Sequence, residues 1–301
     1  MKVGFGAPVS GSWATPENLA FVAQRAEELG YHSLWTFQRL LSPPDAGWGE
    51  VYRSVHDPLL PLAYAAAVTS RIRLGVAVVN LPFVSPVVLA KQLATLDILS
   101  GGRVDAGIGN GWADEEFAAT GADKQRQGAR AEEFLTVLRR LLTDDVIAHD
   151  GEFYRVPQMR MDPKPVQRPH PPILLGAGAP SALRRAGRLC DGWVSSSRAD
   201  LTRLGESAAV VREAAARAGR DPDTLRFVCR GSVRVRPAGD GQRAPLSGTL
   251  EQIRSDFDAV AAQGITELFI DLNFDPEIGS PDADPVASRR RAEEALEAFA
   301  P

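Results

Sequence analysis

A glycine-rich turn followed by a hydroxyl side chain is the first chemical signal in this sequence. Gly176, Gly178 and Ser181 lie between an apolar run and the expected start of a helix, where free backbone N–H groups attract anions. Arg198, which follows the next apolar run, could bring a forked guanidinium to the same anion. This spacing predicts a phosphate-binding turn, although glycines that only permit a tight turn, beside a solvated Arg198, would give the same pattern.

Aromatic and polar side chains follow the ends of other apolar runs. Trp13, Trp48 and Trp112 fall on such loops, as expected around a planar ligand that needs apolar walls. His56 comes just before Asp57, the expected cap of a helix, where a structural role is the alternative to a chemical one. The four histidines are scattered and no Cys/His cluster has ligand spacing, so we expect no metal site.

These loops belong to a regular alternation of expected strands and helices. The expected strands are short runs rich in Val, Ile and Leu, as buried parallel strands are: Lys2–Gly6, Ser33–Phe37, Ile72–Asn80, Arg103–Gly107, Ile173–Gly176, Gly192–Ser196, Leu225–Val233 and Glu267–Asp271. The expected helices lie at 16–29, 58–70, 86–99, 128–142, 180–188, 200–218, 249–263 and 285–299. This alternation predicts an α/β protein that folds as a single (β/α)₈ barrel domain over residues 1–301, with a doubly wound open sheet as the alternative.

Local signals support this arrangement. Thr15, Asp57 and Ser85 each precede a proline and are expected to cap the helices that follow. A long insertion follows strand four, and its Asp150-Gly151 pair predicts a hairpin turn. The active site of a (β/α)₈ barrel lies on the loops at the carboxyl ends of the strands. The loops that carry the tryptophans and the glycine-rich turn should therefore face one mouth.

Composition excludes several classes of protein. The chain has 301 residues, a formal charge of −4 and 44% hydrophobic residues, which is an ordinary globular composition with no polybasic surface for nucleic acid. The longest apolar runs are too short for a membrane span. Two cysteines are too few for a disulfide framework, and no secretory leader is recognised, so we expect a cytoplasmic protein.

Motifs spread over most of the chain resemble one known family. They are Thr69-Ser70-Arg71-Ile72-Arg73-Leu74-Gly75, Leu89-Ala90-Lys91-Gln92, Leu96-Asp97-Ile98-Leu99-Ser100-Gly101-Gly102-Arg103, Gly107-Ile108-Gly109-Asn110-Gly111-Trp112, Glu115-Glu116-Phe117, Pro163-Lys164-Pro165-Val166-Gln167, Pro171-Pro172-Ile173-Leu174-Leu175-Gly176 and Asp191-Gly192-Trp193. The chain resembles the luciferase-like monooxygenase superfamily of (β/α)₈-barrel flavin and deazaflavin oxidoreductases. Within that superfamily it resembles the branch that depends on coenzyme F420.

The resemblance implies where a cofactor would bind. The ring system would lie at the barrel mouth against the end of strand three, where family members often hold a non-prolyl cis peptide, here expected near Ala77–Val78. The glycine-rich turn would be the phosphate cradle, completed by Ser196 and Arg198. The positions expected to contact the cofactor are Ala77, Val78, Asn80, Asn110, Trp112, Gly176, Ala177, Gly178, Ser181, Ser196 and Arg198.

One departure from the family pattern concerns catalysis. Many relatives have an acidic residue and a histidine after strand two, and the matching pair here is Gln38-Arg39. Neither side chain can act as a general acid near neutral pH. If protons are needed, His56 and Glu116 are the candidate donors. Alternatively, Arg39 could stabilise a developing anion or bind an acidic group of the substrate.

The resemblance therefore leads to an expected function with alternatives. The first is an oxidoreductase that moves a hydride between the C5 atom of reduced F420 and a small organic substrate. The second keeps the fold and uses FMN, supplied by a partner reductase, with oxygen as co-substrate. The third is a non-catalytic flavin-binding protein, suggested by the missing acid–histidine pair. We also expect a homodimer, with a flavin or F420 reductase as electron supplier and no nucleic-acid or membrane partner.

Overall fold

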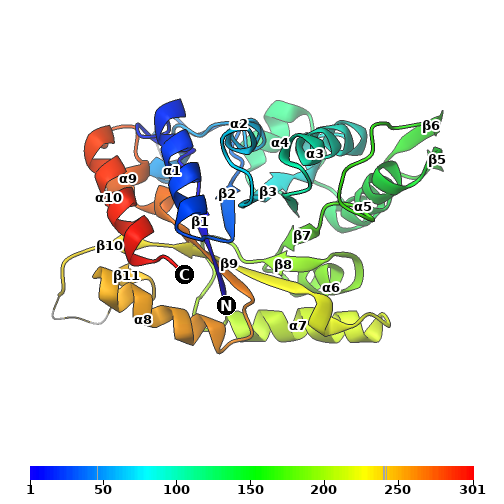
Figure 1. The fold of residues 1–301 in the computed structure, drawn as a ribbon. Helices are drawn as coiled ribbons and strands as arrows, with labels where there is room; N and C mark the ends of the chain where they lie inside the picture. The colour runs from blue at the N-terminus through cyan, green and yellow to red at the C-terminus, as the bar shows by residue number, and fades with distance from the viewer. Residues whose placement is uncertain (46, 240, 242) are drawn as a thin grey trace.

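A closed barrel of parallel strands forms the centre of the protein (Figure 1). The computed structural model describes residues 1–45, 47–239, 241 and 243–301. Within these residues eight strands close the barrel in the order β1-β12-β9-β8-β7-β4-β3-β2. Their bounds are β1 Lys2–Gly6, β2 Ser33–Thr36, β3 Arg73–Asn80, β4 Val104–Gly109, β7 Ile173–Gly176, β8 Gly192–Val194, β9 Arg226–Ser232 and β12 Glu267–Asp271. The predicted (β/α)₈ barrel is therefore confirmed, and the open sheet is excluded.

Helices surround the barrel on its outer side (Figure 1). Those that follow barrel strands are α1 Pro16–Glu28, α2 Leu60–Val68, α3 Pro86–Ser100, α5 Gln127–Thr143, α6 Pro180–Leu189, α7 Leu204–Arg217, α8 Leu250–Ala261 and α10 Pro285–Ala298. The shorter helices α4 Asp114–Thr120 and α9 Pro276–Gly279 were not predicted. Single turns of 3₁₀ helix lie at Glu50–Tyr52, Leu81–Phe83, Pro222–Thr224 and Leu272–Phe274, and the short strands β10 Arg234–Val235 and β11 Ser247–Gly248 pair with each other.

Side-chain caps begin two of the helices as predicted. The hydroxyl of Thr15 accepts a hydrogen bond from the backbone N–H of Asn18, and the hydroxyl of Ser85 does the same for Val88. The predicted start of α2 at Asp57-Pro58 was wrong. Asp57 Oδ1 accepts from the N–H groups of Leu59 and Leu60 at 2.8 and 3.0 Å, which holds a turn that precedes the helix.

The insertion after strand four contains the predicted hairpin. Strands β5 Ile147–Asp150 and β6 Arg155–Met159 are antiparallel, and they project from the edge of the barrel (Figure 1). The carboxylate of Glu133, on α5, accepts hydrogen bonds from the backbone N–H groups of residues 152, 153 and 154 in the connecting turn. The Glu133 side chain thus ties the turn of the hairpin to α5.

Aromatic side chains fill the middle of the barrel. The rings of Trp35 on β2 and Phe269 on β12 stack with their centroids 5.1 Å apart. Leu174, Val194 and Val228 pack around them from the other strands. Because this layer is solid, the barrel offers space for a ligand at its ends and not through its centre.

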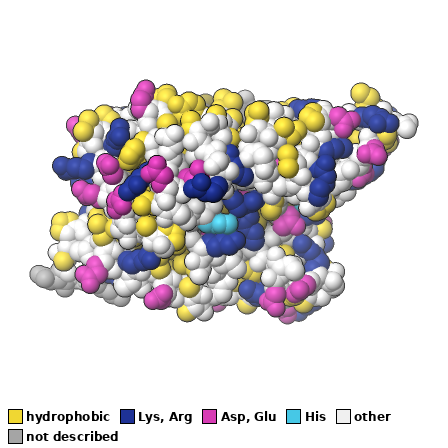
Figure 2. Space-filling view, viewed as in Figure 1, with side chains coloured by type: hydrophobic (Ala, Val, Ile, Leu, Met, Phe, Trp, Pro, Cys, Tyr) yellow, Lys and Arg dark blue, Asp and Glu magenta, His cyan; other side chains and the backbone are white. Residues whose placement is uncertain are grey.

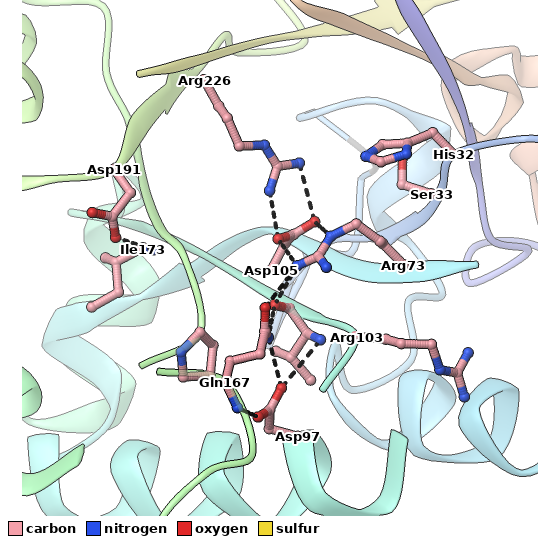
Figure 3. A network of polar contacts seen from close by, with 12 residues as sticks. His32, Ser33, Arg73, Asp97, Arg103, Asp105, Gln167, Ile173, Asp191 and Arg226 are labelled. Atoms are coloured by element: carbon pink, nitrogen blue, oxygen red, sulfur yellow. Dashed lines mark hydrogen bonds and ion pairs between the residues drawn. The ribbon is translucent and has the colours of Figure 1, made fainter. Parts of the chain in front are cut away.

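Buried charges form the floor of the barrel, at the amino-terminal ends of the strands (Figure 3). Asp105 on β4 accepts hydrogen bonds from Arg73 on β3 and from Arg226 on β9, at 2.5–3.1 Å. Arg226 also donates to Glu267 on β12 at 2.8 Å. Burial opposes ionisation of Asp105, but the hydrogen bonds of Arg73 and the charge of Arg226 outweigh it and lower the pKa of Asp105.

The floor reaches the surface beside His32. Figure 2 shows a histidine among Lys and Arg side chains near the middle of the face that it presents. The side chains of His32, Arg73 and Arg226 are each about a quarter exposed, whereas Asp105 and Glu267 lie almost fully buried beneath them. No helix of the described residues is long and apolar enough to span a bilayer.

Candidate active site

A cavity of about 500 Å³ lies at the opposite end of the barrel from this floor. Its wall comes from the carboxyl ends of β3, β4, β7, β8 and β9 and from the loop after β2, as the rule for barrel active sites predicts. Its volume is in the range of small-molecule and cofactor sites. The predicted site residues that line it are Gln38, Arg39, Ala77, Val78, Asn80, Asn110, Trp112, Gly176, Ala177, Gly178 and Ser196.

Four predicted residues do not line this cavity. His56 is exposed, and its backbone N–H donates to the carbonyl oxygen of Val9. Ser181 borders a separate groove between α6 and α7. Arg198 borders an adjoining pocket, and Glu116 is buried behind Arg39. As placed by the structure, His56 and Ser181 are therefore not in contact with this cavity.

The end of β3 forms one wall of the cavity. The peptide bond between Ala77 and Val78 is cis, as predicted. The side chain of Val78 lies against Gly109 and Gly176, where an added Cβ would come within 2.6 and 2.8 Å of it. Because both positions are glycine, the side chain of Val78 has space in the cavity wall.

Arg230 is a cavity residue that the sequence did not reveal. It lies inside the expected strand Leu225–Val233, and its Nη1 donates to the carbonyl oxygen of Ala77 at 3.1 Å. Its Nε donates to Asp271 at 2.8 Å. The sequence did contain one signal for this residue, which is a charged side chain inside an apolar strand. Such a side chain needs a polar partner when it is buried. Arg230 thus ties β9 and β12 to the end of β3.

Gln38 and Arg39 have different roles in the cavity wall. Gln38 links two elements of the wall, and Arg39 places a positive charge in it. Gln38 Oε1 accepts from the backbone N–H of Asn80 at 2.7 Å, which joins the loop after β2 to the end of β3. Arg39 is 7% exposed, and its Nη1 donates to Glu116 at 2.8 Å. Glu116 also accepts from the backbone N–H groups of Leu40 and Leu41. The Glu116 carboxylate therefore fixes the position of Arg39.

Aromatic rings surround the guanidinium of Arg39. Its Cζ lies 4.6 Å from the ring centre of Trp112, 4.8 Å from that of Tyr52 and 5.2 Å from that of Trp48. The guanidinium of Arg198 also lies over Trp112, at 5.2 Å. Burial lowers the pKa of Arg39, and Glu116 opposes this shift. Arginine nevertheless stays charged in water-accessible sites, so Arg39 supplies a fixed positive charge.

The start of α6 has the features of an anion site. The helix begins at Pro180 after Ala179, and no side chain caps its first turn. An added Cβ on Gly178 would have no atom within 4 Å, so this side of the turn is open. The Ala177 carbonyl accepts from Trp193 Nε1 at 2.8 Å, which holds the turn in place. The turn fits the phosphate of a cofactor by this geometry.

Comparison with known proteins identifies related sequences. The sequence model of the luciferase-like monooxygenase family matches residues 3–267. An uncharacterized protein of Mycobacterium tuberculosis is 40% identical over 171 residues, which are 56% of this chain and 60% of that protein. The F420-dependent glucose-6-phosphate dehydrogenase of Amycolatopsis mediterranei is 33% identical over 65% of this chain and 58% of its own length. The FMNH(2)-dependent dimethylsulfone monooxygenase of Pseudomonas putida is 32% identical over 58% of this chain and 47% of its own.

A solved structure agrees with these sequence relationships. The monooxygenase RslO1 from Streptomyces bottropensis superposes with a TM-score of 0.80 and 25% identity, over 99% of this chain and 98% of that one. The chain spans 60% or less of the length of the curated relatives it matches.

Proposed function

Because the chain belongs to the luciferase-like monooxygenase family, we propose that it is an oxidoreductase that transfers a hydride between the C5 atom of coenzyme F420 and a small organic substrate. The observation that carries this proposal is the single cavity wall shared by Val78 and the open turn before α6. The relative from Amycolatopsis mediterranei, whose name states F420 dependence, supports the choice of cofactor.

The residues that would hold the cofactor come from three strand ends. Ala77 and Val78 would face the ring system, and Asn110 would lie beside it. Gly176 and Gly178, with the uncapped first turn of α6, would receive the phosphate. When bound, the deazaflavin supplies a two-electron hydride donor or acceptor at C5. The chain's own task is to place the substrate against that atom and to exclude water.

Glu116 has a positioning role in this proposal. Its two carboxylate oxygens accept hydrogen bonds from Arg39 and from the backbone N–H groups of Leu40 and Leu41. We therefore assign it to hold Arg39 in the cavity wall and not to donate a proton. His56, the other candidate donor, lies outside the cavity. We therefore assign neither His56 nor Glu116 as a proton donor.

An FMN-dependent monooxygenase is the second candidate. It is favoured by the relative from Pseudomonas putida, whose name states FMNH(2) dependence. In this case reduced FMN would come from a separate reductase, and oxygen would be the co-substrate. The same turn before α6 would accept the phosphate of either cofactor, so direct binding must decide.

The deciding experiment is a titration of the purified protein with F420 and with FMN, followed by fluorescence and absorbance. We expect micromolar or tighter binding of F420 and weaker binding of FMN. FMN binding with no response to F420 would overturn the first proposal in favour of the second.

A variant tests whether the cofactor uses the proposed turn. Gly178→Val projects two methyl groups into the open side of the turn and should weaken cofactor binding at least tenfold without lowering the melting temperature. The matched control is Gly239→Val, because an added Cβ there also meets no atom within 4 Å and the residue lies outside the cavity. Equal affinities for the two variants would remove the turn from the site.

A further inference from the structure

Arg39 differs from two other deeply buried arginines, Arg103 and Arg230, in how few of its donors are used. Arg39, Arg103 and Arg230 are each 7% exposed. Arg103 donates from Nε, Nη1 and Nη2 to a hydroxyl and four backbone carbonyls. Arg230 donates from Nε and Nη1 and pairs through Nη2 with Asp271. Arg39 Nε, in contrast, is buried without a hydrogen-bond partner among the described residues.

A buried donor without a partner is costly, and this one belongs to a side chain that lines the cavity. Nη1 of Arg39 is engaged by Glu116, which leaves the edge formed by Nε and Nη2. That edge presents two parallel N–H groups, and it matches the two oxygens of a carboxylate. The unused donors therefore indicate a carboxylate as the partner, whereas the positive charge alone would indicate any anion.

The charge around Arg39 also favours an anion. Glu116 compensates one positive charge, and its own charge is shared with two backbone N–H groups. Arg198, whose Cζ lies 5.2 Å from the ring centre of Trp112, adds a second guanidinium for which no acidic partner is found among the described residues. Arg39 in the cavity wall and Arg198 in the adjoining pocket thus carry together one uncompensated positive charge, beside aromatic rings that suit an apolar ligand body.

We propose that Arg39 determines specificity by binding the carboxylate of the substrate, so that the substrate class is small organic acids with an apolar or aromatic body. This inference rests on the proposed function, because it concerns the substrate of the same cavity. The rings of Trp112 and Tyr52 would contact the body of the acid, and the carboxylate would accept hydrogen bonds from the donors of Arg39 that Glu116 does not engage.

The first test measures binding of two matched probes, benzoate and benzamide, by calorimetry on the protein without cofactor. They have the same shape and differ in charge. We expect benzoate to bind at least tenfold more tightly than benzamide and to change the tryptophan fluorescence. Equal affinities for the two probes would overturn the proposal.

Variants of Arg39 test whether this residue causes the preference for benzoate over benzamide. Arg39→Lys keeps the charge but loses the fork, and it should weaken benzoate binding several-fold. Arg39→Gln would leave Glu116 buried without its partner, so the double variant Arg39→Gln/Glu116→Gln removes both charges at similar volume. In the double variant benzoate should bind no better than benzamide. Circular dichroism confirms that each variant is folded.

Two controls separate this site from others. Arg203→Gln changes an exposed arginine that does not line the cavity and should leave benzoate binding unchanged. If benzoate binding instead survives in the Arg39 variants and is lost in Gly178→Val, the anion binds at the start of α6 and the proposal fails. Because cofactor is absent from this assay, failure of F420 to bind would overturn the proposed function without altering these results.

Discussion

Arg39 and Arg230 lie on the wall of one cavity and have opposite surroundings. Arg230 bonds to Asp271 and to the carbonyl oxygen of Ala77, and its guanidinium lies over the rings of Phe37 and Phe274. Its donors are used within the protein, so its role is to hold strands together. Arg39 uses only Nη1 in a hydrogen bond among the described residues, so donors of this cavity residue remain for a ligand.

Replacing Arg230 should therefore affect stability. Arg230→Met keeps much of the volume but leaves Asp271 buried and without its ion pair, which should cost about 3 kcal/mol of unfolding free energy. The double variant Arg230→Met/Asp271→Asn should recover part of this loss. Urea denaturation measures both, and an effect of Arg230→Met no larger than that of the exposed Arg203→Met would contradict the assigned role.

The two cysteines should be unreactive in the folded protein. Cys190 and Cys229 are fully buried, and burial raises the pKa of each thiol to about 12. Since the thiolate is the reactive form, a disulfide reagent such as Ellman's reagent should release no colour near pH 8 until denaturant is added. Two thiols per chain should then react. Rapid reaction of either cysteine in native buffer would show that the barrel opens locally.

The site residues that could be predicted from the sequence are those whose position follows from the order of strands and helices. Gln38 and Asn110 follow strand ends and Gly176 is the last residue of its strand. Because the strand ends meet at one mouth, the convergence of these residues followed from the alternation of elements. Arg230 could not be found in this way, because which face of β9 points inward depends on register with its neighbours. The unused edge of Arg39 depends on where Glu116 lies, seventy-seven residues further along the chain.

Glycines in β4 mark places where the chain approaches itself. An added Cβ on Gly107 would lie 1.9 Å from the backbone oxygen of Val76 on β3, and neither strand can move without opening the ladder. Gly111 has a φ of +69°, which favours glycine. The run from Gly107 to Gly111 resembles part of a dinucleotide fingerprint, but its glycines serve close packing and a turn.

Gly107→Ala should therefore destabilise the barrel strongly, by about 3 kcal/mol or more, or prevent folding. Gly178→Ala, whose added Cβ meets no neighbour within 4 Å, is the matched control and should change stability by well under about 1 kcal/mol. Thermal denaturation followed by circular dichroism compares the two. Similar melting temperatures would mean that β3 and β4 can separate more readily than their packing indicates.

Elements with strong periodicity or caps were predicted closely. The bounds of β1, β7 and β12 agree with those expected from the apolar runs, and α3 begins after its Ser85 cap. Helix α4 was missed because Asp114–Thr120 is short and lacks a clear apolar face. Its place is set by packing, since Phe117 on α4 lies against Phe83 with the ring centres 5.0 Å apart.

The charged floor should make the whole molecule sensitive to mild acid. Burial lowers the pKa of His32 below its usual 6.5, and the nearby Lys2 and Arg226 add to the effect, while Glu267 and Asp105 oppose it. The unfolded chain then binds more protons than the folded one as the pH falls below about 6.5. The free energy of unfolding should therefore decrease between pH 7.5 and pH 5.5.

His32→Gln isolates this contribution. The variant lacks the titrating ring, so its free energy of unfolding should fall less over the same interval than that of the parent protein. Urea denaturation at the two pH values gives the comparison. Carboxylates such as Asp105, whose pKa is lowered from 3.8, titrate below this interval and do not obscure it. Parallel pH profiles for the two proteins would exclude His32 as the source.

Closure of the barrel has a consequence for how the protein is made. Residues Lys2 to Phe5 of β1 pair with Glu267 to Ile270 of β12, and Glu267 also accepts hydrogen bonds from Ser33 and Trp35. On the ribosome, the first strand is synthesised some 265 residues before this partner. This edge of β1 must therefore remain without its partner until about 265 further residues have been synthesised, and a chaperone can protect it during that interval.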